Sequence, residues 1–133
     1  MVVSGGVLEH IPKGNVPGLL AEMRRVLVPS GWSLHSIDTQ NHLSYYHPKV
    51  SRKMYLTFSD RTWRNVFENR VQYINRLQRR EWLELFTAAG FKLFEEDSWY
   101  TDLGQLQLAG RFRGMDKRDL ECTGPRLLHK KLV

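Results

Sequence analysis

Nine residues near the start of the chain, Ser4-Gly5-Gly6-Val7-Leu8-Glu9-His10-Ile11-Pro12, carry the most information about its fold. The short apolar run over residues 1–4 predicts a strand, and the glycine pair ends it. Glu9 and His10 therefore follow the end of a strand closely. Because α/β sheets bind ligands at the carboxyl ends of their strands, this pair is the first candidate for a functional site.

The segments that follow alternate between helix and strand. Apolar residues at positions 19, 20, 23, 26 and 27, three or four apart along successive turns, predict an amphipathic helix over residues 19–27. Strands are predicted over residues 32–37, 91–99 and 121–131. Pro125, inside the last of them, suits an edge, a strand start or a bulge, because proline donates no ladder hydrogen bond. The alternation predicts an α/β layer with a mainly parallel sheet.

Three further helices are predicted. Residues 79–89 present an apolar face, and Gly90 supplies the position after the helix that favours a left-handed backbone. Residues 59–74 carry a second apolar stripe, which two asparagines weaken, and residues 116–120 predict a short helix. Residues 39–58 show no clear periodicity and are expected to form a loop.

Composition places the chain among ordinary globular domains. The 133 residues are 41% apolar and 26% charged, which excludes disorder and a fibrous repeat, and their number suits one domain. The single cysteine, Cys122, excludes a disulfide framework and a cysteine-rich zinc module. No apolar run is long enough for a membrane helix, and the first residues do not resemble a signal peptide. We therefore expect a soluble, cytoplasmic protein with no membrane partner.

The positive charge is concentrated in the middle third of the chain. Residues 45–80 carry nine basic and two acidic side chains, or +7, against +6 for the whole chain. Aromatic residues are interleaved with these cations, a mixture that suits single-stranded nucleic acid. The expected polyanion contacts are Arg52, Lys53, Arg61 and Arg64. In the alternative interpretation the rings belong to the core and the cations to a solvated face.

Several motifs together resemble those of class I S-adenosylmethionine (AdoMet)-dependent methyltransferases. The residues that carry the resemblance are Val7-Leu8-Glu9-His10-Ile11, Arg25-Val26-Leu27, Ser36-Ile37-Asp38 with His42, Tyr55 to Trp63, Asn75-Arg76-Leu77 and Ala89-Gly90-Phe91. The resemblance covers almost the whole chain. It implies methyl transfer to an acceptor that the sequence does not identify, and a partial Rossmann-like sheet. Its strands correspond to family strands four, five, seven and six, with strand seven antiparallel.

Two cofactor-binding features of that family are absent from the sequence. The chain has no glycine-rich turn for close approach to AdoMet and no strand-end carboxylate for the ribose. We therefore expect residues 1–133 to be a C-terminal half domain, with a basic, aromatic-rich insertion at about residues 39–78. AdoMet is expected to bind only when an N-terminal half completes the domain. Whether the chain is an enzyme stays open. The open edge of the first strand predicts a homodimer or a complementing N-terminal half.

The resemblance also implies roles for four residues. Glu9 and His10 would lie on the cofactor side, and Asp38 and His42 would be catalytic on the acceptor side, with histidine suited to act as a general base. Alternatively, the first pair only fills a turn and the second lies in an exposed loop. No metal is expected, because Gly6 stands where small-RNA 2′-O-methyltransferases place a third ligand beside the Glu-His pair.

Two further expectations concern helix capping and an alternative function. Arg80 stands where family members often place a capping serine or threonine, which predicts a weak helix start. The alternative function is a non-catalytic binding or oligomerisation module, which would bind nucleic acid or an acidic partner through residues 45–80.

Overall fold

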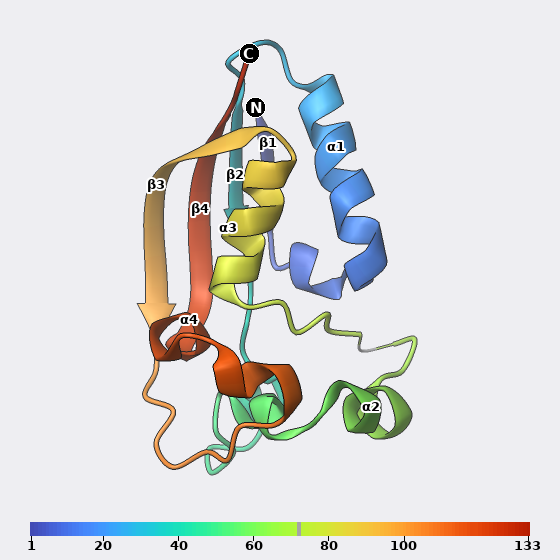
Figure 1. The fold of residues 1–133 in the computed structure, drawn as a ribbon, viewed down its shortest axis with the longest axis vertical. Helices are drawn as coiled ribbons and strands as arrows, with labels where there is room; N and C mark the ends of the chain where they lie inside the picture. Colours follow the sequence, from blue (N-terminus) through green and yellow to red (C-terminus); the bar gives the residue numbers. More distant parts are fainter. Residues whose placement is uncertain (72) are drawn as a thin grey trace.

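The structure is a computed structural model that describes residues 1–71 and 73–133. At its centre is a four-stranded mixed sheet with the strand order β1-β2-β4-β3 (Figure 1). The strands are β1 (Val2–Gly5), β2 (Trp32–Ser36), β3 (Phe91–Tyr100) and β4 (Cys122–Lys131). β1 is parallel to β2, and β4 is antiparallel to both of its neighbours. The α/β class and the strand order implied by the resemblance are confirmed.

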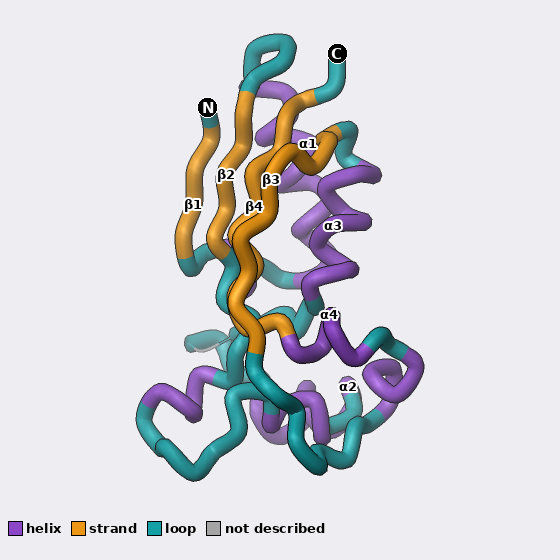
Figure 2. Tube along the Cα trace, turned by 90° about the vertical axis from the view of Figure 1, so that its left-hand side faces the viewer, coloured by secondary structure: helices purple, strands orange, loops and turns teal. Residues whose placement is uncertain are grey.

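Two helices, α1 (Val16–Val26) and α3 (Arg79–Ala88), cover one face of this sheet, and no helix covers the opposite face in the described part of the chain (Figure 2). Below the sheet lie two short helices, α2 (Asp60–Thr62), which continues into a π-helical turn over Trp63–Phe67, and α4 (Lys117–Glu121). Short 3-10 turns occupy Leu8–His10, Lys13–Asn15, His42–Tyr45, Met54–Thr57 and Gly110–Gly114. No helix in the described residues is long and apolar enough to span a bilayer.

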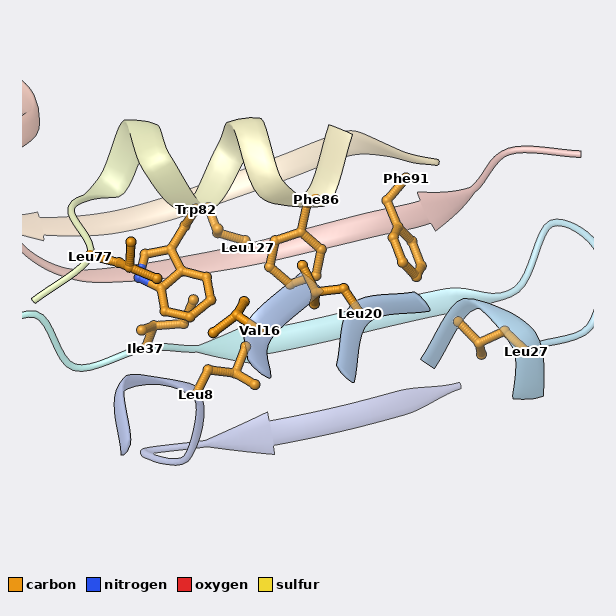
Figure 3. Close-up of a cluster of buried hydrophobic side chains, with 10 residues drawn as sticks. All are labelled: Leu8, Val16, Leu20, Leu27, Ile37, Leu77, Trp82, Phe86, Phe91 and Leu127. Atoms are coloured by element: carbon orange, nitrogen blue, oxygen red, sulfur yellow. The ribbon is translucent and has the colours of Figure 1, made fainter. Parts of the chain in front are cut away.

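The main core lies between the two helices and the sheet (Figure 3). Leu20 of α1 and Trp82 and Phe86 of α3 are fully buried and lie in one cluster with Leu127 of β4. The amphipathic spacing expected for residues 19–27 is confirmed by this packing, although α1 begins at Val16 and ends one residue before Leu27. Burial of these side chains fixes the two helices against one face of the sheet.

The start of α3 corrects the expectation of a weak cap at Arg80. The helix begins at Arg79, and Gln78 and Glu81 form a capping box in which the Gln78 N–H donates to Glu81 Oε2 at 2.8 Å. A glutamine thus takes the place of the usual serine or threonine. At the other end Gly90 has φ 84°, as its position after the helix requires.

The helix expected over residues 59–74 is much shorter than predicted. Helical structure ends at Phe67, and Ile74 is buried from an extended segment instead. Asn69 Oδ1 accepts a hydrogen bond from the Val71 N–H at 2.9 Å, so the asparagine side chain replaces the helical backbone partner. Residue 72 lies outside the described residues.

Pro125 lies in an interior strand and not at an edge. The register between β3 and β4 shifts at the Trp99 and Tyr100 pairs, beside the proline. Of the three positions expected for this proline, an edge strand is wrong. Pro125 lies near the start of β4 and beside a bulge, where a missing N–H is tolerated.

Candidate functional site

The carboxyl ends of β1 and β2 bring the two predicted residue pairs together. Gly5 pairs with Ser36 in the parallel ladder, so the two strands end side by side. Gly6, at φ 64°, turns the chain into the Leu8–His10 turn, while Asp38 follows β2 closely. Parallel strands end at the same edge of a sheet, and this edge is where open α/β sheets bind ligands.

Glu9 is a buried carboxylate. Its side chain is only 3% exposed, and Oε2 has no hydrogen-bond partner among the described residues. Burial raises the pKa of Glu9, and this effect outweighs the nearby backbone N–H groups and His10, which lower it. An unpartnered buried carboxylate oxygen is costly, so a ligand that supplied positive charge or a donor would be stabilised here.

Hydrogen bonding fixes the tautomer of His10. Nδ1 lies 2.8 Å from the carbonyl oxygen of Tyr73, which only accepts, so Nδ1 carries the proton and donates it. Nε2, which carries the lone pair in the neutral form of this tautomer, lies 3.8 Å from Glu9 Oε1. The Glu9-His10 pair therefore presents a carboxylate and an imidazole lone pair close to each other.

Asp38 and His42 form the second pair. His42 Nε2 is 3.2 Å from Asp38 Oδ2, and the Tyr45 hydroxyl donates to the same oxygen at 2.6 Å. Burial acts to raise the pKa of Asp38, but the contacts from His42, Tyr45 and the Gln40 N–H outweigh it and lower that pKa. In turn, the contact with the Asp38 carboxylate raises the pKa of His42.

The two pairs meet through their histidines. The rings of His10 and His42 lie edge to face with centroids 5.2 Å apart. Glu9, His10 and His42 each offer one ligand atom, and these atoms all lie within 4.8 Å of one another. Gly6 offers no ligand, but His42 in the loop after β2 supplies a third donor beside Glu9 and His10.

A ring-lined pocket adjoins His42. It has a volume of about 200 Å³, and its walls are Asn41, His42, Leu43, Met54, Phe58, Trp63, Phe67 and Ile74. The rings of Trp63 and Phe67 stack at 5.2 Å, and Phe58 lies against both. These aromatic residues were considered for base stacking; in the structure they pack against one another and line this pocket.

The segment before α3 holds the Glu9-His10 turn in place. Asn75 Nδ2 donates to the carbonyl oxygens of Leu8 and Ile11 at 2.9 and 3.0 Å, and the Asn75 N–H donates to the Glu9 carbonyl oxygen at 2.8 Å. No expectation from the sequence placed Asn75, Tyr73 or Tyr45 at this site; the two tyrosines were expected only among the rings of the basic segment. The only available signal was the Asn75-Arg76-Leu77 motif of the resemblance.

Lys53 does not lie at the surface, as a contact to a polyanion would require. Lys53 is fully buried, and its ammonium donates to Gln78 Oε1 at 3.0 Å, so it cannot reach a polyanion. Arg52, Arg61 and Arg64 are exposed, and none of them has an ion-pair partner among the described residues.

Comparison with solved structures identifies the fold as that of the AdoMet-dependent methyltransferases. One match is a SAM-dependent methyltransferase from Methanosarcina mazei, with a TM-score of 0.61 and 17% identity over 98% of this chain and 58% of that one. Another is a protein assigned as a methyltransferase from Bacillus halodurans, with a TM-score of 0.51 and 14% identity over 99% of this chain and 69% of that one. The chain thus spans 58% of the first of these proteins. No family model and no curated protein matches it.

Proposed function

We propose that the protein takes part in AdoMet-dependent methyl transfer, with the candidate site as its acceptor end. The observation that carries this proposal is the position of His42. It belongs to the cluster at the carboxyl ends of β1 and β2, and it also forms part of the wall of the ring-lined pocket. One side chain thus joins the edge where this fold binds ligands to a pocket for an apolar part of the acceptor.

In the proposed reaction AdoMet supplies an activated methyl group, and the acceptor nucleophile gains the methyl and loses a proton. His42 is placed to take that proton, and Asp38 is placed to orient the imidazole through its 3.2 Å contact. Glu9 and His10 lie on the cofactor side of the pair. The rings of the pocket orient the acceptor and exclude water.

We also propose that this chain requires an N-terminal half that carries the glycine-rich turn. The free edge of β1 and the uncovered face of the sheet support this proposal. That face presents apolar side chains that pair across the strands, Val3 opposite Leu34 and Leu34 opposite Leu128, while Trp32 and Phe94 pack ring to ring at 4.9 Å. In the absence of such a half, a second copy is the expected partner at this edge.

The test compares AdoMet binding in two forms of the protein. By calorimetry, we expect weak binding to residues 1–133 alone. Low-micromolar binding is expected when the chain is expressed together with the segment that its gene encodes upstream, provided that this segment carries the glycine-rich turn. Low-micromolar binding to residues 1–133 alone would contradict the requirement for a second half. In the completed form, His42→Gln should lower methyl transfer far more than it lowers AdoMet binding.

The exposed arginines favour a second candidate function, a non-catalytic module that binds an acidic partner. Arg52, Arg61 and Arg64 have no carboxylate partner among the described residues, which leaves their charge free for a phosphate-rich ligand. This alternative is tested with an oligonucleotide.

A further inference from the structure

We propose that Glu9, His10 and His42 bind one divalent transition-metal ion, with zinc as the ion that suits them best. The three residues place two imidazole nitrogens and one carboxylate oxygen within 4.8 Å of one another. Two histidines with one carboxylate form a well-known type of zinc site. The binding of the metal does not depend on the proposed methyl transfer.

The distances are close to those of a formed site. Zinc binds nitrogen and oxygen ligands at about 2.0–2.2 Å, so tetrahedral neighbours lie about 3.4 Å apart. His10 Nε2 and Glu9 Oε1 are already 3.8 Å apart. The ligand atom of His42 lies within 4.8 Å of the other two, so its imidazole, carried by the 3-10 turn His42–Tyr45, has to approach them to complete the set.

The atoms around the cluster prepare its donors for a cation. The backbone carbonyl oxygen of Tyr73 accepts a hydrogen bond from His10 Nδ1. This leaves the Nε2 lone pair free to bind an ion, which is the usual arrangement of a metal-binding histidine. The Asp38 carboxylate beside His42 is a typical outer partner of such a ligand.

A second, independent observation comes from Glu9. Its carboxylate is 3% exposed, and its Oε2 atom is buried without a hydrogen-bond partner among the described residues. An unsatisfied buried carboxylate oxygen is costly, and a bound cation removes that cost.

Three protein ligands leave a coordination position open. In zinc sites of this kind a water or a substrate atom occupies it. Because His42 also forms part of the wall of the pocket of about 200 Å³, an acceptor oxygen in that pocket lies close to the open position. This role, unlike metal binding itself, rests on the proposed methyl transfer, and in the metal-bound form the ion would activate the acceptor oxygen in place of His42.

The experiment titrates Zn²⁺ into chelator-treated protein in the absence of AdoMet. We expect one Zn²⁺ per chain by calorimetry and a higher midpoint of thermal unfolding, because the ion binds the folded state. His42→Ala and Glu9→Gln should each weaken binding at least about tenfold, which is the effect expected for loss of a ligand or of its partner. His47→Ala, a histidine of the same loop that lies outside the cluster, is the matched control and should bind as the wild type does.

Co²⁺ provides a second readout, since its visible spectrum reports nitrogen and oxygen coordination and should change in His42→Ala but not in His47→Ala. Circular dichroism establishes whether each variant is folded. If Glu9→Gln does not fold, the comparison of His42→Ala with His47→Ala tests the proposal. The proposal is overturned if the folded wild type binds no Zn²⁺, if His42→Ala binds it unchanged, or if His47→Ala weakens binding equally. Since AdoMet is absent, failure of methyl transfer leaves the result intact.

Discussion

Asn75 Nδ2 donates a hydrogen bond to the carbonyl oxygen of Leu8, 2.9 Å away and 67 residues distant in sequence. A side chain of the segment before α3 thus holds the turn that presents Glu9 and His10. The geometry of the site therefore depends on two segments that lie far apart in the sequence.

The first prediction concerns this clamp. Asn75→Ala removes the two side-chain hydrogen bonds to the carbonyl oxygens of Leu8 and Ile11, so the free energy of unfolding should fall by about 1–3 kcal/mol. Chemical denaturation measures the loss. Asn65→Ala, at an exposed asparagine, is the control and should change stability little. An equal loss of stability in both variants would show that the Asn75 hydrogen bonds do not stabilise the turn.

The second prediction concerns Lys53. Burial lowers the pKa of this lysine to about 7, from 10.5 in an exposed side chain. Between these two values the unfolded chain binds the proton and the folded chain does not, so stability should rise as the pH increases from 7 towards 10. Lys53→Met should remove this rise. The measurement is the difference in free energy of unfolding between variant and wild type at several pH values; a difference independent of pH contradicts the prediction.

The third prediction concerns acid stability. Burial, together with the smaller effect of the neighbouring His35, lowers the pKa of His129 to about 4. The His129 ring stacks on Phe86 with centroids 4.1 Å apart. The unfolded chain takes up the proton near pH 6.5 and the folded chain only near 4, so stability should fall as the pH drops through this window, by about 1.4 kcal/mol per pH unit for one histidine.

His129→Phe keeps the stacked ring and removes the titrating group, so the acid unfolding midpoint should move to lower pH. His47→Phe, at an exposed position, serves as the control. Tryptophan fluorescence during acid titration follows the transition. An unchanged midpoint in His129→Phe would show that other groups determine acid unfolding.

The fourth prediction concerns the edge of the sheet. Val3 is 57% exposed on β1, whose outer side has no strand partner in the described chain. We expect the protein to associate at high concentration, and Val3→Lys to keep it monomeric, because a charge at an edge opposes strand pairing. Light scattering over a range of concentrations measures this. Val26→Lys, at a valine of α1 that is 55% exposed, is the matched control and should associate as the wild type does.

The fifth prediction tests the exposed cations. If the chain binds an oligonucleotide, the affinity should fall steeply with salt, and Arg61→Glu with Arg64→Glu should weaken it. Fluorescence anisotropy at several salt concentrations provides the measurement. Lys53→Met, which removes a buried charge, should bind as the wild type does. Binding that does not depend on salt, or no binding at low salt, counts against this alternative.

The parts of the fold that were predicted correctly are those that local pattern determines. The spacing around Leu20 predicted α1, and the run around Phe86 predicted α3, because one apolar face must be buried in each case. The extent of the middle helix was wrong, because the Asn69 side chain competes with the backbone near Val71. Apolar spacing carries no information about that competition.

The site was predicted only in part, for a related reason. A strand end is visible in the sequence, so Glu9 and Asp38 were named. The carbonyl of Tyr73 that orients His10 and the approach of His42 to Glu9 depend on how the loops fold back over the sheet. Lys53 shows the reverse case: its charge suggested a surface position, and the structure buries it beside Gln78.

The position of β4 between β2 and β3 has a consequence for synthesis on the ribosome. β3 pairs only with β4, and β4 is the last strand to be made. Until residues 122–131 emerge, the nascent chain contains β1 paired with β2 and a ten-residue strand with no neighbour in the sheet. Assembly of the sheet is therefore a late event, and a nascent chain stalled before residue 122 exposes the edges of both β2 and β3 to chaperones and to other chains.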